Sequence, residues 1–139
     1  MGSATSGTEL TERECWERLR NEAYGRLAVI GPDGPAIYPI NSVVDHGSIV
    51  FRTAEGGKLE SIRADPRVSF EADGWDVGDD VAWSVVVAGL AREIVRPLEG
   101  ADVTELGVTP WQAGPKPSYV RIDPSSIAGR TFRRSDRTT

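Results

Sequence analysis

The chain has 139 residues, of which 39% are hydrophobic and 27% charged, a composition that indicates one ordinary globular domain. Its net charge of -5 disfavours nucleic acid as a partner, and its one cysteine and one histidine disfavour an internal disulfide, a metal centre and a histidine-based triad. No apolar run reaches the roughly 18 residues of a membrane helix and the N-terminus carries no secretory pattern, so we expect a cytoplasmic protein with no membrane contact.

The first predicted element is a helix over residues 11–22, because its start carries a capping signal. Thr11 can cap the helix, and Glu14, three residues later, completes a capping box. Leu10 before the cap and Cys15 at the fourth helical position fit a hydrophobic staple. We therefore interpret Cys15 as a small buried hydrophobe and not as a reactive thiol.

Three strands joined by short turns are predicted next, over residues 25–30, 35–44 and 48–53. Strands connected so closely form an antiparallel meander. Pro39 lies inside the second strand and cannot donate a hydrogen bond, so pairing there is expected to be interrupted or one-sided. Backbone groups near Pro39, Ile40 and Asn41 would then be able to reach something other than a neighbouring strand.

The second half of the chain predicts a short helix and three further strands. The helix spans residues 58–64, and the strands cover residues 67–73, 82–95 and 118–122. Both faces of the strand at 82–95 are largely apolar, so we expect one face in the core and the other against a second copy of the chain. Residues 96–117 are expected to be irregular, with one helical turn at 101–106.

These elements predict a mainly β fold, a six-stranded antiparallel barrel with short flanking helices. The β-α-β alternation and the G-x-G-x-x-G pattern of a dinucleotide-binding Rossmann fold are both missing from the sequence. The expected organisation is a disordered tail at residues 1–9, one domain at residues 10–132 and a disordered tail at residues 133–139.

The segment IVFRTAEGGKL places many hydrogen-bond donors between a strand and a helix. Arg52 supplies a fork of donors, Thr53 a hydroxyl and Lys58 a positive charge near the start of the helix. Gly56 and Gly57 allow close backbone approach, and amides at a helix N-terminus favour an anion. The segment fits a phosphate site, and it equally fits a plain turn with a solvated arginine and lysine.

Four segments in this order resemble one known family, and the similarity covers residues 10–132. They are GRLAV, YPINSVV, IVFRTAEGGKL and WSVVVAGLAREI. Together they resemble the pyridoxamine 5'-phosphate oxidase-like family of FMN-binding split barrels. Within that family, the chain is most similar to the short actinobacterial members grouped with nitroimidazole-resistance reductases.

The resemblance implies a homodimer with two FMN molecules at its interface. It places the phosphate at Arg52, Thr53 and Lys58. The flavin ring would lie along the strand that carries Pro39, Ile40 and Asn41. The long strand of the partner subunit would bring Trp83 and Ser84 beside the ring.

Each implied role has a simpler alternative. Trp83 equally fits a core or dimer position, and Ser84 equally fits a hydrogen bond to a neighbouring strand. Asn41 can also be a local turn former. Arg121 and Arg130 can pair with acidic loops, and Arg130 can instead reach the cofactor.

The chain departs from true pyridoxamine phosphate oxidases, which carry a C-terminal arginine and histidine for the substrate's phosphate. No histidine follows His46, so we do not expect oxidation of vitamin B6. Related split barrels bind a deazaflavin or haem, and a deazaflavin's polyglutamate tail needs basic residues such as Arg63, Arg67, Arg92 and Arg96.

Two functions follow from the resemblance. The first is an FMN-dependent oxidoreductase or reductase that acts on a small molecule, such as a nitroaromatic or quinone-like compound, with an electron donor. The second is a non-catalytic carrier or sensor of flavin, deazaflavin or haem. We identify no catalytic side chain, since in such enzymes the cofactor carries the redox chemistry.

Overall fold

A computed structural model describes residues 7–94 and 118–133 of the chain. Its elements are β1 (Gly7–Glu9), α1 (Glu12–Arg20), β2 (Tyr24–Gly31), β3 (Gly34–Asn41), β4 (Val43–Asp45), β5 (Ser48–Thr53), α2 (Gly57–Ala64), β6 (Arg67–Asp76), β7 (Val81–Glu93) and β8 (Ser118–Arg133). The predicted helical turn at 101–106 and Arg96 lie outside the described residues.

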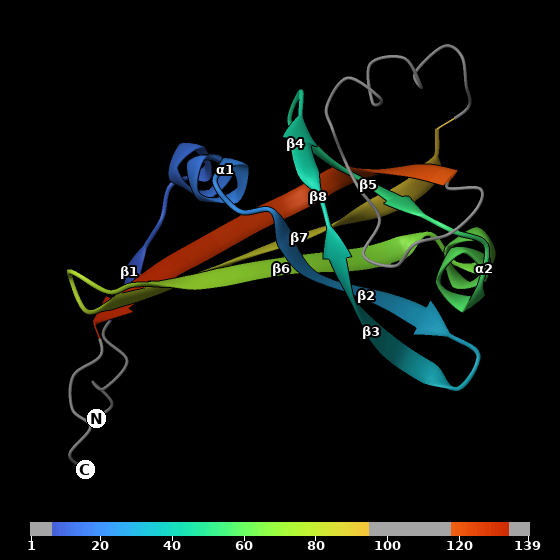
Figure 1. The fold of residues 1–139 in the computed structure, drawn as a ribbon, viewed down its shortest axis with the longest axis horizontal. Helices are drawn as coiled ribbons and strands as arrows, with labels where there is room; N and C mark the ends of the chain where they lie inside the picture. Colours follow the sequence, from blue (N-terminus) through green and yellow to red (C-terminus); the bar gives the residue numbers. More distant parts are fainter. Residues whose placement is uncertain (1–6, 95–117, 134–139) are drawn as a thin grey trace.

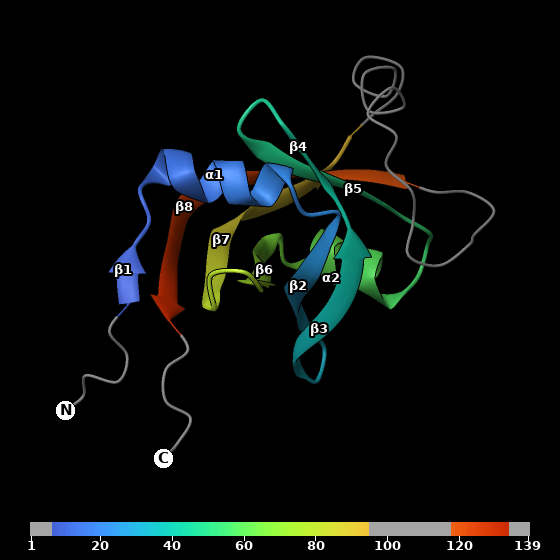
Figure 2. The ribbon, with the colours of Figure 1, turned by 60° about the vertical axis from the view of Figure 1, so that its left-hand side comes forward.

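The strands form one antiparallel, strongly curled sheet in the order β3-β2-β6-β7-β8-β5-β4, with β1 paired to β8. One helix lies over each end of the sheet: α1 near the start of the chain and α2 beside the β2–β3 hairpin (Figures 1 and 2). The mainly β class, the antiparallel split-barrel form and the two short helices are therefore confirmed.

The prediction of six strands was wrong, because the described residues contain eight. The predicted strand at 35–44 divides at Ser42, whose backbone N–H donates to the carbonyl of Ala23 at 3.0 Å instead of to a sheet partner. This bend separates β3, which pairs with β2, from β4, which pairs with β5. The other additional strand, β1, is a short segment in the stretch that we expected to be disordered.

Pro39 behaves as its chemistry requires. The ladder between β2 and β3 continues through the pair Arg26 and Pro39, and β3 is the last strand of the described sheet on that side. Proline is tolerated on an edge strand because the missing N–H faces away from the neighbouring strand. Pairing at Pro39 is thus one-sided, one of the two forms that we expected.

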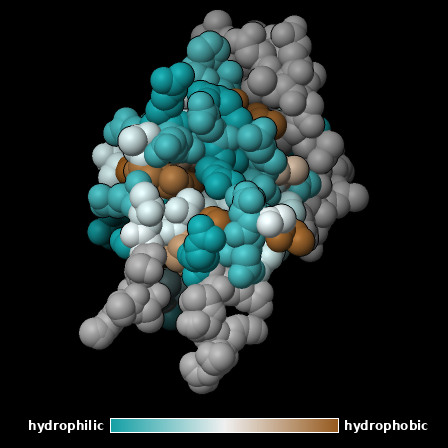
Figure 3. Space-filling model, turned by 90° about the vertical axis from the view of Figure 1, so that its left-hand side faces the viewer, coloured by the Kyte–Doolittle hydropathy of each residue, from teal (hydrophilic) through white to brown (hydrophobic). Residues whose placement is uncertain are grey.

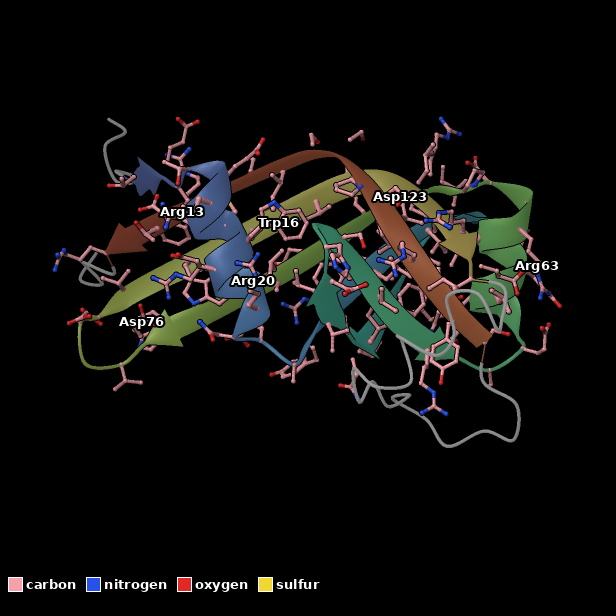
Figure 4. All side chains as sticks on the ribbon, turned by 90° about the horizontal axis from the view of Figure 1, so that it is seen from above. Arg13, Trp16, Arg20, Arg63, Asp76 and Asp123 are labelled. Atoms are coloured by element: carbon pink, nitrogen blue, oxygen red, sulfur yellow. The ribbon has the colours of Figure 1, made fainter. Side chains whose placement is uncertain are left out.

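The first helix begins as predicted. The Thr11 hydroxyl accepts from the Glu14 N–H at 3.1 Å, and the Glu14 carboxylate accepts from the Thr11 N–H at 2.8 Å. Cys15 and Leu19 are buried on its inner face, and Trp16 is half-buried against the same core (Figure 4). The end of the molecule that carries α1 is mainly hydrophilic, with separate hydrophobic areas (Figure 3).

The long strand β7 has one buried and one exposed face. Val85 and Val87 are fully buried in the core, whereas Val86 is 44% and Leu90 is 53% exposed. Alternation of side chains along a strand produces this division.

Neither described helix has the length and hydrophobicity that crossing a membrane requires.

Candidate functional site

The turn from β5 into α2 leaves the first amides of the helix without a side-chain cap. Gly56 precedes α2 with φ 156° and ψ -169°, backbone angles that are accessible essentially to glycine alone. No side chain caps the first turn of α2. The amides of that turn have no partner within the helix, and they carry the positive end of its dipole.

Lys58 is the charged residue at this turn. Its ammonium nitrogen lies 5.3 Å from the centre of the Tyr38 ring, and burial lowers its pKa. In the part of the chain that the structure describes, Lys58 makes no ion pair with a carboxylate. A desolvated ammonium beside helix amides is suited to an anionic ligand.

Tyr38 belongs to the same corner, although the sequence analysis did not single it out. A Cβ on Gly57 would lie 3.7 Å from the Tyr38 hydroxyl oxygen, so this ring on β3 reaches the first residue of α2. The signal in the sequence was an aromatic residue directly before Pro39. An aromatic side chain at that place on a strand is equally typical of a core position.

The predicted phosphate residues of β5 point to opposite sides of the strand. Thr53 is buried on the inner side, and its hydroxyl donates to the Ala54 carbonyl at 3.3 Å. Arg52 is on the other side, with its guanidinium carbon 5.4 Å from the centre of the Tyr119 ring. The structure therefore places Thr53 at the end of β5 that leads into α2, while Arg52 stacks on β8.

The residues predicted to line the flavin ring are divided in the same way. Ile40 is 1% exposed and belongs to the core. Pro39 and Asn41 point to the outer side of β3, where they pair with Arg26 and Tyr24 of β2. Of the three residues predicted to line the ring, only Pro39 and Asn41 present side chains to the outer face of the sheet.

The remaining predicted residues lie far from the α2 corner in a single chain. Trp83 is buried under α1, with the Arg18 guanidinium 5.2 Å from its ring. Ser84 lies on the outer side of β7, opposite Arg130 of β8. The start of β7 and the end of β8 are at the α1 end of the molecule, whereas α2 is at the opposite end (Figure 1).

A charged group that sequence reasoning missed lies on the outer face of the sheet. The Arg26 guanidinium contacts Glu71 at 2.7 Å and Asp73 at 3.0 Å. Burial, together with a hydrogen bond to Asp73, raises the pKa of Glu71 despite the opposing effect of Arg26. The pairing of β2 with β6 places Arg26, Glu71 and Asp73 on the same face of the sheet. The sequence did not predict which strands pair, so it could not reveal this contact.

Three of the four arginines that could serve a polyanionic tail are paired with carboxylates. Arg63, at the α2 end of the molecule, contacts Glu93 at 2.8 Å and Glu55 at 2.9 Å (Figure 4). Two further pairs, Arg67 with Asp65 and Arg92 with Asp123, each have contacts of 2.7 Å. These carboxylates would compete with a polyanionic tail for the three arginines.

Comparison with known proteins gives matches over nearly the whole chain. The family model described as pyridoxamine 5'-phosphate oxidase matches residues 11–131. A structure named as an FAD-binding protein from Mycobacterium smegmatis is 39% identical, with a TM-score of 0.76, and covers 91% of this chain and 100% of that one. A Corynebacterium glutamicum structure named after pyridoxamine 5'-phosphate oxidase is 38% identical, with a TM-score of 0.80, and covers 94% of this chain and 96% of that one.

A more distant structure shares the fold alone. It comes from Bacteroides thetaiotaomicron and is named for 5-nitroimidazole antibiotic resistance. It is 14% identical, with a TM-score of 0.71, and covers 92% of this chain and 89% of that one.

Proposed function

The chain belongs to the pyridoxamine 5'-phosphate oxidase family, and on this premise we propose that it is a flavin-dependent oxidoreductase that binds FMN and acts on a small molecule. The observation that carries the proposal is the desolvated ammonium of Lys58, without a carboxylate partner among the described residues, beside the uncapped first turn of α2. The similarity to an FAD-binding protein supports a flavin as the ligand.

The residues at the corner fit the phosphate of FMN. The amides of the α2 turn and the Lys58 ammonium are donors, and the buried Thr53 hydroxyl ends the strand that leads there. The glycine pair permits the backbone to approach an anion closely. These groups would bind and orient the cofactor, and Arg52 stays a predicted contact from the other side of β5.

When bound, the flavin would supply the hydride or electron transfer, and the protein would supply binding and orientation. Pro39 and Asn41 on the outer side of β3 are the proposed contacts for the edge of the ring. Glu71 is a group that could hold a proton near the outer face, because burial raises its pKa. Nitroaromatic and quinone-like compounds are the substrates to test first.

The second part of the proposal is a homodimer. Val86 and Leu90 form an exposed apolar stripe on β7, and large apolar residues in such a place favour a covering partner. A second copy on this face is also the way in which Ser84 and Arg130 of the partner subunit would approach a cofactor held at α2, whereas Trp83 points into the core of its own chain.

FMN is preferred over a deazaflavin on electrostatic grounds. Arg63, Arg67 and Arg92 already have carboxylate partners, so a polyglutamate tail would have to compete with them. The missing histidine after His46 speaks against vitamin B6 as the substrate.

The test begins with the absorption spectrum of the purified protein and mass identification of any small molecule released on denaturation. A flavin spectrum with released FMN or FAD supports the proposal, and so does saturable flavin binding to apoprotein. Turnover of a reduced nicotinamide with a quinone would establish the oxidoreductase. Binding without turnover would instead indicate a carrier or sensor, and a bound haem would contradict the proposal.

The dimer has its own test. Val86→Asp places a charge on the exposed stripe, and we expect it to give a monomer in sedimentation and to lower flavin affinity together. The matched control is Val77→Asp, at an 81% exposed position in the β6–β7 turn. A stable wild-type monomer at micromolar concentration, or full flavin affinity in a monomeric variant, would refute the dimer proposal.

A further inference from the structure

Arg26, Glu71 and Asp73 join two neighbouring strands on the outer face of the sheet. Arg26 of β2 is the register partner of Glu71 on β6, and its guanidinium contacts Glu71 at 2.7 Å and Asp73 at 3.0 Å. Glu71 and Asp73 are two residues apart on one strand, and their carboxyl groups are hydrogen-bonded to each other. An ionised carboxylate only accepts hydrogen bonds, so this contact needs a proton on one of the two. The arrangement is therefore suited to holding a shared proton in a fixed place.

A second arginine with two carboxylates shows the opposite behaviour. At the α2 end of the molecule, Arg63 contacts Glu93 at 2.8 Å and Glu55 at 2.9 Å. Hydrogen bonds from Arg63 lower the pKa of Glu55, as an arginine beside a carboxylate ordinarily does. Burial instead raises the pKa of Glu71, although an arginine contacts it as well. The group on the outer face thus favours a protonated carboxyl where the group at α2 favours an ionised one.

The position of Glu71 lies between the two surfaces that the proposed function uses. Pro39 on β3, Arg26 on β2 and Glu71 on β6 are successive register partners across the sheet. Val86, in the exposed apolar stripe of β7, is the next partner of Glu71. Neighbouring strands are about 4.8 Å apart, so Glu71 lies roughly 10 Å from Pro39 along the sheet. Its side chain is 31% exposed, and a small molecule held on this face near Pro39 would come within its reach.

Two neighbouring charges control the titration of Glu71. Among the described residues, the charged side chains that act on it are Asp73, which raises its pKa, and Arg26, which lowers it. Across the strand pair, Glu71 faces Val86 and Asp73 faces Ser84, and neither of these partners carries a charge. Replacing Asp73 or Arg26 should therefore move the titration of Glu71 in opposite and known directions.

We propose that the carboxyl group of Glu71 supplies the proton for the reduction of a quinone-like substrate, and that Asp73 and Arg26 position this carboxyl. The inference rests on the proposed flavin-dependent function and adds an acid to it. When a reduced nicotinamide reduces a quinone to a hydroquinone, a hydride with its two electrons passes by way of the cofactor, the nicotinamide is oxidised, and one further proton is taken up. That proton forms an O–H bond at a quinone oxygen as the O–H bond of Glu71 breaks. Water then returns a proton to the carboxylate.

The first experiment is the pH dependence of kcat/KM for quinone reduction by the flavin-loaded protein. A proton donor acts in its protonated form, so kcat/KM should decline as the pH rises through the pKa of Glu71. Glu71→Gln should lower kcat/KM by about 100-fold and remove that decline. The matched control is Glu93→Gln, which takes a strand glutamate of similar exposure, 36% against 31%, from its arginine. This control should change neither the rate nor the pH profile.

Two further variants separate a proton donor from a structural ion pair. Asp73→Asn removes a neighbour that raises the pKa of Glu71, so the decline in kcat/KM should move to lower pH. Arg26→Gln removes a neighbour that lowers this pKa, so the decline should move to higher pH. A purely structural role would instead lower the rate at every pH and leave the midpoint of the decline in place, which would contradict the proposal.

Nuclear magnetic resonance of the glutamate carboxyl carbons gives a readout that does not depend on activity. Glu71 should titrate at higher pH than Glu55. Its titration should move upward by about one unit when the bound flavin is reduced, because added negative charge nearby favours the protonated form. A Glu71 carboxyl that does not respond to reduction, or an unchanged rate and pH profile in Glu71→Gln, would overturn the inference while flavin binding and turnover stand. Absence of flavin binding or of turnover would refute the proposed function, and the inference with it.

Discussion

The two ends of β5 each hold a partly buried cation, and they treat it differently. At the start of the strand, Arg121 of β8 contacts the Asp45 carboxylate at 3.0 Å and the Ser48 hydroxyl at 2.6 Å. The side chains of Arg121 and Asp45 are only 13% and 12% exposed. At the other end, Lys58 has an aromatic ring and helix amides beside it, and the described chain supplies no carboxylate.

The difference separates a structural cation from a candidate ligand site. Burying a charge is costly unless it is paired, so a fold with no further task for Lys58 would be expected to expose or pair it, as it pairs Arg121. The side chains around Arg121 balance its charge, whereas we propose that an anion from outside the chain balances the charge of Lys58. The predicted pairing of Arg121 with an acidic segment is confirmed.

The largest effect is expected on stability, at the start of β5, where Arg121 is paired with Asp45. Arg121→Met leaves the Asp45 carboxylate buried without its guanidinium, and we expect a loss of about 3 kcal/mol in the free energy of unfolding, the low end for a broken buried pair. Urea denaturation at neutral pH measures it. Flavin affinity should not change in protein that is still folded.

The pH dependence of the same pair has a definite sign. Burial opposes ionisation of Asp45, but hydrogen bonds from Arg121 and His46 outweigh it, so its pKa in the folded protein is below the ordinary 3.8. The stabilisation is therefore fully present above about pH 4 and is lost as the pH falls through the folded-state pKa.

The control for Arg121→Met is Arg92→Met, at an exposed ion pair, which should lower the free energy of unfolding by less than about 1 kcal/mol. An equal loss in the free energy of unfolding for both variants would mean that the buried pair of Arg121 contributes no more to stability than an exposed pair.

The next effect is expected at Lys58, which follows the other end of β5, and it concerns ligand affinity instead of stability. Lys58→Ala should weaken FMN binding about 10- to 100-fold, since a charge-assisted hydrogen bond contributes about 1.5–3 kcal/mol. Riboflavin lacks the phosphate, so its affinity should hardly change. The free energy of unfolding should stay the same or rise, because a desolvated charge is removed. Equal losses for FMN and riboflavin would mean that the corner is structural.

A pH series sharpens the same test. Burial lowers the pKa of Lys58 below the ordinary value of 10.5 in the free protein, and a bound phosphate would favour the protonated form. The preference for FMN over riboflavin should therefore be constant at neutral pH and decline as the pH rises through the lowered value. Lys58→Arg keeps its charge at high pH, so its preference should persist there. A wild-type preference that persists to the same pH would show that the charge of Lys58 is not involved.

The sequence predicted elements better than it predicted which side chains meet. The capping box at Thr11 and the one-sided pairing at Pro39 depend on local chemistry and short spacing, and they were right. The predicted three-strand meander was wrong, because β3 and β5 lie near opposite ends of the strand order and do not pair. The strand count was wrong because the division at Ser42 depends on a hydrogen bond to Ala23, which is distant from the strand pattern. Arg52 and Thr53 are adjacent in sequence, yet strand alternation turns them to opposite sides, and Tyr38 reaches the corner only through the fold.

The smallest expected effect on FMN affinity is at Thr53. A substitution there can distinguish a contact to phosphate from a structural hydrogen bond within the turn. Thr53→Val keeps the shape of a 6% exposed side chain and removes its hydroxyl. A neutral hydrogen bond contributes about 0.5–1.5 kcal/mol, so FMN affinity should fall about 2- to 10-fold, less than in Lys58→Ala. The hydroxyl also donates to the Ala54 carbonyl at 3.3 Å, so the substitution can loosen the turn itself. A loosened turn would lower the free energy of unfolding and weaken FMN and riboflavin equally. Loss confined to FMN, with unfolding unchanged, would place Thr53 among the phosphate contacts, whereas an effect larger than that of Lys58→Ala would contradict the ordering that the unpaired lysine implies.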